Sequence, residues 1–419
     1  MPSAAPAPTA PTAPTTISTD PCRAPALERA MVLLFAVAAG ISVANVYYAQ
    51  PLLDALAADF GIATASAGVV VTATQAGSTL ALLLLVPLGD LLPRRALMLW
   101  QAAALALFLL ALAASASVWT LLAGMLAAGL LGTAMTQGLI AYAAALSAPS
   151  QRGSVLGTVQ SGVVIGLLLA RVVSGALADL GGWRLVYLCS AALIALLGVV
   201  LARTLPPSPA PAAVGGYLRL LASMAALLRH DRALQVRGVL ALLMFAVLNV
   251  FWSALVLPLS APPHSMSHGA IGAFGLVGAI GVLGGSRAGR WADRGLAQRA
   301  SGAALLLLVL SWLPLAFTGT SLWALTGGIL VLDIGAQMIH VTNQSLILRA
   351  HAQAHSRLIG CYMMFYAVGS GGGALAGTHV YASAGWAGVC WLGAAISLAA
   401  LLWWALTLKW MPSVPPTAA

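Results

Sequence analysis

The sequence predicts an all-α integral membrane protein with twelve transmembrane helices, arranged as two six-helix pseudo-repeat bundles around a central cavity. Three observations predict this fold. Of the 419 residues, 61% are hydrophobic and only 7% are charged, whereas a soluble domain carries about 25% charged residues. Apolar stretches long enough to cross a bilayer recur along the whole chain. Landmarks of the first half of the chain also reappear in the second half at a constant spacing.

Each apolar segment is assigned to one membrane crossing. The expected crossings are 30–52, 66–89, 96–115, 118–146, 153–178, 183–203, 237–260, 268–289, 299–318, 321–348, 356–380 and 386–409. The resulting domains are a disordered cytoplasmic tail over 1–27, a first bundle over 28–203, a cytoplasmic linker over 204–236, a second bundle over 237–411 and a cytoplasmic tail over 412–419.

The tail and the linker differ from the rest of the chain in composition. The tail is rich in Pro, Ala and Thr and lacks both the basic start and the apolar core of a signal peptide. The linker begins with "LPPSPAPAAVGG", which no helix would tolerate. It continues as "YLRLLASMAALLRHDRALQ", whose apolar spacing predicts an amphipathic helix on the membrane surface.

The positive charges predict the orientation. Of the 19 Lys and Arg residues, 17 fall in one set of alternate connections and tails, and the other set holds Arg184 alone. The positive-inside rule then places both termini in the cytoplasm. The net charge of +10 therefore reflects orientation and does not indicate a nucleic-acid partner. A composition rich in Ala and Leu with one lysine indicates a GC-rich bacterial genome, and hence the inner (plasma) membrane of a bacterium.

An internal repeat becomes visible when the sequence is shifted by 203 residues. The shift takes Asp90 to Asp293 and Gly182–Trp183 to Gly385–Trp386, and several glycines coincide as well. Asp and Trp matches at one offset are less easily due to chance than glycine matches in a chain with 43 glycines. A duplicated six-helix unit is typical of a transporter with its site between the halves.

Two related loops carry a charged motif. They are "PLGDLLPRR" (87–95) and "GRWADRGLAQR" (289–299), and the first resembles the loop signature Gly-x-x-x-Asp-Arg-x-Gly-Arg-Arg of the major facilitator superfamily. An Asp at one helix end can pair with an Arg of the next and latch one conformational state. The residues expected to form such a latch are Asp90, Arg94, Arg95, Asp293 and Arg294.

The segment "GLLLARVVSG" (166–175) resembles the helix 5 motif of drug-exporting antiporters in the same superfamily. Gly166, Ala170, Ser174 and Gly175 match the small residues of that motif, but Arg171 occupies the position where the motif has proline. The second half repeats the frame as "GSGGGALAGT" (369–378), and small residues four apart let helices pack closely. The resemblance implies a secondary transporter working by alternating access, with proton-coupled efflux of a drug, sugar or metabolite expected first. The arginine that many drug antiporters carry in helix 4 is missing.

The tenth crossing carries a polar stripe. Asp333, Gln337, His340 and Gln344 recur at spacings of four, three and four, and therefore share one helical face. A polar stripe at membrane depth must face protein or water. Asp333 lies roughly 16 Å from the outer helix end at 1.5 Å per residue, which makes it a candidate proton carrier. His340 is a second candidate, although a satisfied interior histidine is an equal alternative.

Arg171 is the only ionisable residue between 153 and 178. A charge at such depth costs at least about 2.5–3.5 kcal/mol, so it needs a partner. We hypothesise a pair with Asp333 across the interface between the halves, which makes Arg171 the third proton-coupling candidate. The alternative is that Arg171 reaches outward to the rim, where Asp179, Asp54 or Asp59 could receive it.

The resemblance implies that the first, fourth, seventh and tenth crossings line a central cavity. Neutral polar and aromatic side chains there, and on the eleventh crossing, suit a small amphipathic substrate. These cavity candidates are Asn45, Tyr48, Gln137, Asn249, Trp252, Gln337, Gln344, Tyr362 and Tyr366. Each is as readily explained as a contact between helices.

The eighth crossing contains glycine at every third position from Gly269 to Gly284. A three-residue period drifts around an α-helix, so we expect a slim helix with close contacts on several sides.

Other functions remain open at this stage. The same fold could serve a proton-coupled importer or a uniporter. An integral-membrane enzyme is a weaker alternative, because the histidine pair of "HAQAH" (351–355) lacks further metal ligands. We expect a monomer that is not an enzyme, with no cofactor and no metal site, and with a small molecule, protons and the lipid bilayer as partners.

Overall fold

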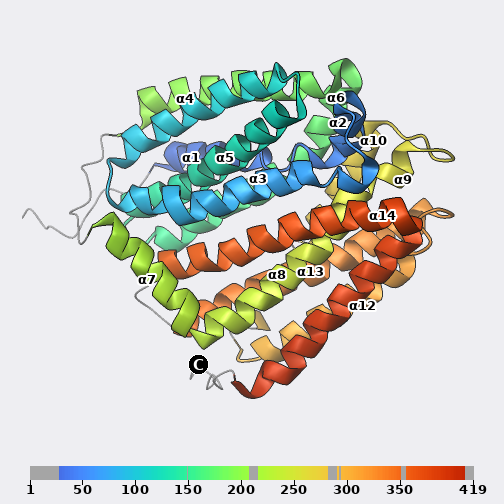
Figure 1. Ribbon diagram of the computed structural model, residues 1–419. Helices are drawn as coiled ribbons and strands as arrows, with labels where there is room; N and C mark the ends of the chain where they lie inside the picture. The colour runs from blue at the N-terminus through green and yellow to red at the C-terminus, as the bar shows by residue number, and fades with distance from the viewer. Residues whose placement is uncertain are drawn as a thin grey trace, which may run out of the picture.

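The computed structural model describes residues 28–148, 150–206, 216–281, 290–291, 294–350 and 355–410. Within these ranges every regular element is helical, as the fold class predicted. Figure 1 shows the helices running across the molecule in two layered groups. Several predicted features lie outside the described residues, namely the 1–27 tail, part of the linker, Asp293, the end of the eighth crossing and residues 351–354.

The first half of the described chain comprises the elements before the linker. They are α1 (Arg29–Ala44), η1 (Gln50–Leu52), α2 (Leu53–Phe60), η2 (Thr64–Ser66), α3 (Val69–Leu80), the π-helical η3 (Ala81–Leu85), η4 (Val86–Asp90), α4 (Arg94–Ala113), α5 (Val118–Leu146) and α6 (Arg152–Thr204). These elements pack mainly against one another.

The second half follows the linker helix α7 (Tyr217–His230). Its described elements are α8 (Arg232–Ala254), α9 (Val256–Ser260), α10 (His268–Ala273), η5 (Phe274–Ile280), α12 (Ala297–Leu315), α13 (Leu322–Ala350), α14 (His355–Thr407) and η6 (Leu408–Trp410). The linker helix has one buried residue, Met224.

Eight described helices are long and apolar enough to cross a membrane. Two of them, α6 and α14, run for 53 residues each and contain non-helical glycines, at 181 and 182 in α6 and at 385 in α14. Figure 1 shows α14 folding back on itself between its orange and red parts. Arg29–Ala44 and His268–Ile280 are shorter apolar helices. The set is consistent with the twelve predicted crossings.

The two halves meet most closely at one end of the molecule. In Figure 1 the helices converge on the right, around α2, α9 and α10, and spread toward the left, where α7 lies. We refer to these as the α10 end and the α7 end. Among the described helices, the most extensive contacts between the halves are those of α6 with α10 and of α14 with α3.

The two inter-half contacts repeat the internal symmetry of the sequence. Gly175 of α6 lies against the backbone of His268, and the hydroxyl of Thr378 in α14 lies 3.5 Å from the carbonyl oxygen of Ala65. The shift of 203 residues takes Gly175 to Thr378 and Ala65 to His268. The repeat in the sequence therefore corresponds to equivalent contacts on the two sides of the interface.

Small residues also bring helices together within each half. Gly162 and Gly166 of α6 meet the α1 backbone at Ala36 and Gly40, which places part of the predicted small-residue frame inside the first half rather than between the halves. Such close approach leaves no room for side chains and lets the backbones contact each other directly.

The glycines of the eighth crossing were expected to drift around an α-helix, but part of this crossing is not α-helical. Residues Phe274–Ile280 form a 3₁₀ helix, which has three residues per turn, so a three-residue period lies along one side. Gly275 faces Arg171 of α6, whereas Gly278 and Gly281 face Asp333 of α13. The glycines thereby let a single thin segment pass close to both charged residues.

Adjacent glycines on α14 provide a test of this packing. A Cβ at Gly373 would lie 2.7 Å from the Ala246 Cα, whereas a Cβ at Gly372 would meet nothing within 4 Å. We expect Gly373→Ala to cost about 1–3 kcal/mol through overpacking. Gly372→Ala should be neutral or slightly stabilising, because alanine favours helix. The measurement is the apparent melting temperature of both variants in detergent, and equal values would contradict the packing argument.

Candidate functional site

At the α10 end, His268 joins the halves through two carboxylates. Its Nε2–H donates to Asp54 of α2 over 3.0 Å, and its Nδ1 lies 3.7 Å from Asp179 of α6. The Asp179 carboxylate also accepts hydrogen bonds from the backbone N–H groups of His268 and Gly269, at 3.0 and 2.9 Å. One carboxylate of the first half therefore caps the first helical turn of α10.

His268 is the first residue of α10, at the loop end of the crossing, and its side chain is 25% exposed. The hydrogen bond to Asp54 raises the pKa of His268 above 6.5, with burial opposing and the charges of Asp54 and Asp179 adding to the rise. Burial alone would raise the pKa of Asp54, but the hydrogen bond and the charge of His268 lower it overall. Both shifts mean that the ionised pair is favoured, so protonated His268 stabilises the contact between the halves.

Midway through the molecule, Arg171 occupies the interface between the halves. It is only 6% exposed, and its Nε–H donates to the Gln50 Oε1 over 2.9 Å. The guanidinium carbon lies 4.2 Å from the ring centre of Trp252 and 5.6 Å from that of Tyr47. Aromatic faces carry negative electrostatic potential and stabilise a cation at such distances.

Gln50 continues the contact into the second half. Its Nε2 donates to the Asn249 Oδ1 over 3.0 Å, and the Asn249 Nδ2 donates to the Phe245 carbonyl oxygen over 3.0 Å. Arg171 is thus linked to α8 through the side-chain amides of Gln50 and Asn249. In each of these amides the oxygen accepts one hydrogen bond and the nitrogen donates one. Gln50 begins the short helix η1, with Pro51 in its first turn, where proline is tolerated because its missing N–H would have no helical partner.

Asp333 of α13 lies on the other side of the glycine segment from Arg171. A Cβ at Gly281 would come within 3.0 Å of Asp333, and a Cβ at Gly275 would come within 3.4 Å of the Arg171 Cδ. Trp252 is a hydrogen-bond partner of the Asp333 carboxylate. The hypothesised direct pair is absent, since within the described chain no Arg171–Asp333 distance falls within the 4.0 Å of an ion pair.

The alternative partners of Arg171 at the rim have other roles. Asp54 and Asp179 bind His268, and Asp59 binds Arg184 at 2.6 Å. Arg171 therefore does not reach outward to these aspartates. Its direction follows from the packing of α6 on α10, which leaves the interface as the space open to a long side chain.

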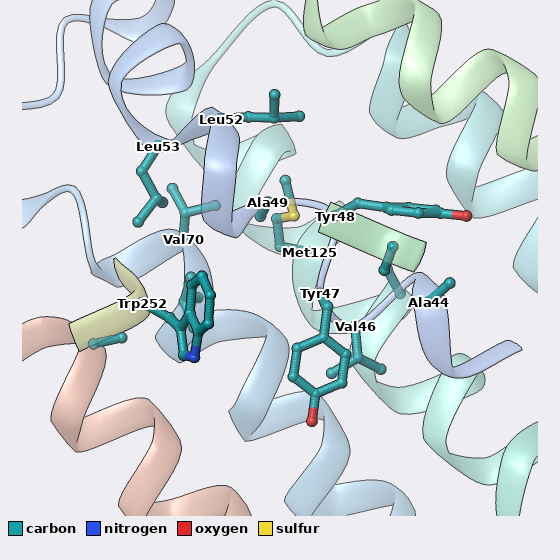
Figure 2. Close-up of a cluster of buried hydrophobic side chains, with 14 of the residues drawn as sticks. Ala44, Val46, Tyr47, Tyr48, Ala49, Leu52, Leu53, Val70, Met125 and Trp252 are labelled. Atoms are coloured by element: carbon teal, nitrogen blue, oxygen red, sulfur yellow. The ribbon is translucent and has the colours of Figure 1, made fainter. Parts of the chain in front are cut away.

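Aromatic rings surround the second-half side of this region. The Tyr47 and Tyr366 hydroxyls contact each other across the interface, and Phe245 stacks edge-on to Tyr366 with ring centres 4.1 Å apart. Figure 2 shows the side chain of Tyr47 pointing in a different direction from that of the neighbouring Tyr48.

Two of the cavity candidates on the first crossing face elsewhere. Asn45 accepts a hydrogen bond from Ser190 of α6 over 2.7 Å, and Tyr48 is also a partner of Ser190. Both lie inside the first half and act as contacts between helices, which corrects their assignment to the cavity. Helix α1 ends at Ala44, so the turn that follows presents Tyr47 and Gln50 to the interface instead.

His340 has neighbours on several sides. Its Nδ1 lies 3.2 Å from the Tyr362 hydroxyl and its Nε2 lies 3.2 Å from the Gln344 Nε2. Its ring also packs edge-on to Phe245. This is the arrangement of a satisfied interior histidine, and it engages Gln344 and Tyr362 within the second half. Gln337 is half-buried on the same helix.

A pocket at the α7 end collects part of the loop motif. Its lining includes Asp90, Arg94, Gln101, Gln137, Met224 and Arg357. Arg94 lies 3.6 Å from Asp90, and Arg95 donates to the Ala202 carbonyl oxygen over 2.6 Å. Both latch arginines are therefore bonded within the first half. Arg294 follows α10 in the chain, and Asp293 lies outside the described residues.

Sequence reasoning left Gln50 and His268 out of the site. A continuous helix over 30–52 places Asn45 and Tyr48 on one face and Gln50 only near it, whereas α1 ends at Ala44. His268 stands at the predicted start of a crossing, where a histidine is unremarkable without knowledge of its neighbours. The presence of three aspartates near the same rim is the signal in the sequence that could have suggested a partner.

A helical membrane protein with two repeated halves and a polar site at their interface has the architecture of a secondary transporter. The family model of the Major Facilitator Superfamily matches residues 34–356, and the chain belongs to this family. It is therefore a multi-pass membrane transporter of that fold.

Relatives and solved structures agree with this assignment. The transporter YgaY of Escherichia coli strain K12, described as uncharacterized, is 43% identical over 379 residues, covering 90% of this chain and 96% of that protein. A bacterial homologue of the human lysosomal transporter Spinster, in an inward-facing and unoccupied conformation, has a TM-score of 0.73 at 14% identity, covering 91% of this chain and 97% of that one. The nucleoside transporter NupG has a TM-score of 0.70 at 16% identity, covering 90% and 100%. These two likenesses concern the fold.

The contacts of His268 predict a pH-dependent closure of the α10 end. Because its pKa is raised, the stabilisation is complete below pH 6.5 and is lost as the pH rises through the raised value. We expect spin labels at the exposed positions Ala116 and Gly319 to move apart as the pH increases.

The variant His268→Gln should show the longer distance at every pH. Arg184→Gln is the matched control, because Arg184 and Asp59 form an ion pair at the same end but inside the first half. A label distance that does not change with pH in the wild type would overturn this prediction.

Proposed function

We propose that this protein is a proton-coupled secondary transporter that moves a small organic compound by alternating access, with Asp333 as the proton carrier. The observation that carries the proposal is the juxtaposition of Asp333 and Arg171 from opposite halves at one interface. A carboxyl group that meets a cation of the opposite half only in some states changes its proton affinity with conformation. Such a change couples proton movement to alternating access.

The contacts between the halves support an assignment of the conformational state. In the part of the chain that the structure describes, the hydrogen bonds that join the halves directly lie at the α10 end or midway. At the α7 end, the linker residue Tyr217 reaches the Leu84 carbonyl oxygen of the first half over 2.9 Å. The halves are therefore held together most firmly at the α10 end.

The positive-inside rule makes the α7 end cytoplasmic, so the state is open toward the cytoplasm. The resemblance to an inward-facing Spinster homologue agrees with this proposal. Asp90, Arg94 and Arg95, bonded within the first half here, would then be free to meet the second half when the α7 end closes. We further propose a monomer in the bacterial inner membrane with both termini in the cytoplasm.

The direction of transport has two candidates. The resemblance of residues 166–175 to drug-exporting antiporters favours export against proton entry. Arg171, however, replaces the proline of that motif and adds a positive charge to the site. This charge favours a second candidate, the movement of substrate and proton together in one direction.

Replacing Asp333 with Asn tests the proton carrier. We expect Asp333→Asn to abolish proton movement that depends on a transported compound, because an amide cannot release a proton at neutral pH. The measurement uses purified protein in proteoliposomes with a trapped pH-sensitive dye, an imposed proton gradient and a panel of drugs, sugars and organic acids.

Asp59→Asn serves as the control, since Asp59 lies at the exposed rim and pairs with Arg184. It should retain the proton signal of the wild type. Equal proton movement in wild type and Asp333→Asn would show that another group carries the proton, and the assignment of Asp333 would fail.

A further inference from the structure

Most of the hydrogen-bonding capacity of Arg171 is unused. A guanidinium has five N–H donors, and in Arg171 only the Nε–H donates, to Gln50. Within the described residues, Nη1 and Nη2 have no hydrogen-bond acceptor and no carboxylate within 4.0 Å. The side chain is nevertheless 94% buried, being 6% exposed. In the described part of the chain, Nη1 and Nη2 are not among the fully enclosed polar atoms that lack a partner, so both groups border space that water or a ligand can reach.

Arg237 of α8 shows how this fold satisfies the terminal nitrogens of a buried arginine, although the Arg237 Nε–H itself has no acceptor among the described residues. Arg237 is 1% exposed, and its Nη1 donates to Ser301 and Asn343 while its Nη2 donates to Gln298. Both of its terminal nitrogens have acceptors from neighbouring helices. The difference indicates that the terminal nitrogens of Arg171 are reserved for a group that the protein itself does not supply.

We propose that the transported compound carries a carboxylate or similar oxyanion, which binds the Nη1 and Nη2 groups of Arg171. The inference rests on the proposed function, because it names the substrate class of the same site. A guanidinium presents parallel donors that match a carboxylate in bidentate geometry. The rings of Tyr47 and Trp252 beside the guanidinium give the rest of the compound an apolar surface.

Asp333 links this anion to the proton. Among the described residues, Asp333 is the acid whose charge acts on Arg171. An ionised Asp333 and a bound anion compete for the same guanidinium, so the anion binds best when Asp333 carries a proton. Anion and proton are therefore bound together and released together. The anion and the proton therefore cross the membrane in the same direction, which is symport. Their charges cancel, so the site gains no net charge when both are bound.

A cationic compound would behave in the opposite way. It would be repelled by Arg171 and attracted by ionised Asp333, so it would compete with the proton and give exchange. The two classes of substrate are thus separated by the sign of their coupling to the proton as well as by affinity.

Matched probes test the substrate class. The panel consists of benzoate, phenylacetate and octanoate, each with its amide and its amine, and binding to the purified full chain is measured by titration calorimetry. We expect at least one carboxylate to bind about 10- to 100-fold more tightly than its amide, as charge-assisted hydrogen bonds provide. The amines should bind no better than the amides. If no carboxylate exceeds its amide tenfold, or if an amine binds best, the proposal is wrong.

Variants of Arg171 connect the preference to this side chain. Arg171→Gln should reduce the preference for carboxylate over amide to within about twofold, whereas Arg171→Lys, which keeps the charge without the bidentate geometry, should retain part of it. Arg184→Gln is the control, because Arg184 lies at the rim, and it should keep the full preference. An unchanged preference in folded Arg171→Gln overturns the proposal.

Proton uptake gives a measurement that does not depend on the folding of Arg171 variants. In weak buffer, binding of the carboxylate to the wild type should take up as much as about one proton when Asp333 starts ionised, and binding of the amide none. Asp333→Asn should bind the carboxylate without uptake. Carboxylate binding that releases protons, or leaves them unchanged at every pH tested, contradicts the coupled binding.

The two proposals fail in different ways. If neutral or cationic compounds drive proton movement that Asp333→Asn abolishes, the proton carrier stands and the anionic substrate is wrong. If carboxylates bind through Arg171 but move across the membrane without protons, the substrate class stands and the proton coupling is wrong.

Discussion

The burial of one positive charge in the interface between two apolar bundles is the constraint that organises the centre of this protein. Arg171 cannot be left without compensation, because an isolated charge in a low-dielectric region is costly. The structure compensates it in three ways, through the hydrogen bond to Gln50, through the rings of Trp252 and Tyr47, and through the charge of Asp333. Gln50 and Tyr47 belong to the same half as Arg171, whereas Trp252 and Asp333 come from the other half, so part of this compensation depends on the packing of the halves.

That packing in turn depends on residues without side chains. The 3₁₀ segment Phe274–Ile280 places Gly275 beside Arg171, and Gly278 beside Asp333. A Cβ at Gly275 would lie 3.3 Å from the Arg171 Cβ, and one at Gly278 would meet the Asp333 carboxylate, so a larger side chain at either position would shift a charged residue. The segment is therefore both a packing element and the spacer that sets how closely the two charges approach. A change in its position during alternating access would alter their interaction.

The α10 end uses polar contacts for the same task of joining the halves. Asp54 and Asp179 of the first half hold His268 of the second, and glycines bring the backbones close enough for these bonds to form. Polar groups and small residues therefore act together, since a hydrogen bond across two helices requires their close approach. The equivalent contact between α3 and α14 uses neutral groups, with Gly68 donating to Thr378.

Much of the candidate site was predictable because polar residues are rare in this chain. Asp333, Arg171, Asn249 and Trp252 were all identified by standing in apolar segments, and the structure brings them near one interface. Asn45 and Tyr48 were assigned to the wrong surroundings. Periodicity shows which residues share a face, but it does not show whether that face meets a neighbour of the same half or of the other.

The sequence by itself determined the fold class, the repeat and the family, because these follow from hydrophobic length, from a constant offset and from motifs in the loops. Each of these is a local property or a comparison of one stretch of chain with another. Only the tertiary structure decided which groups meet across the interface. Gln50 reaches Arg171 from 121 positions away in the chain, and His268 reaches Asp54 from 214. Such contacts depend on the packing of whole helices, and no local pattern encodes them.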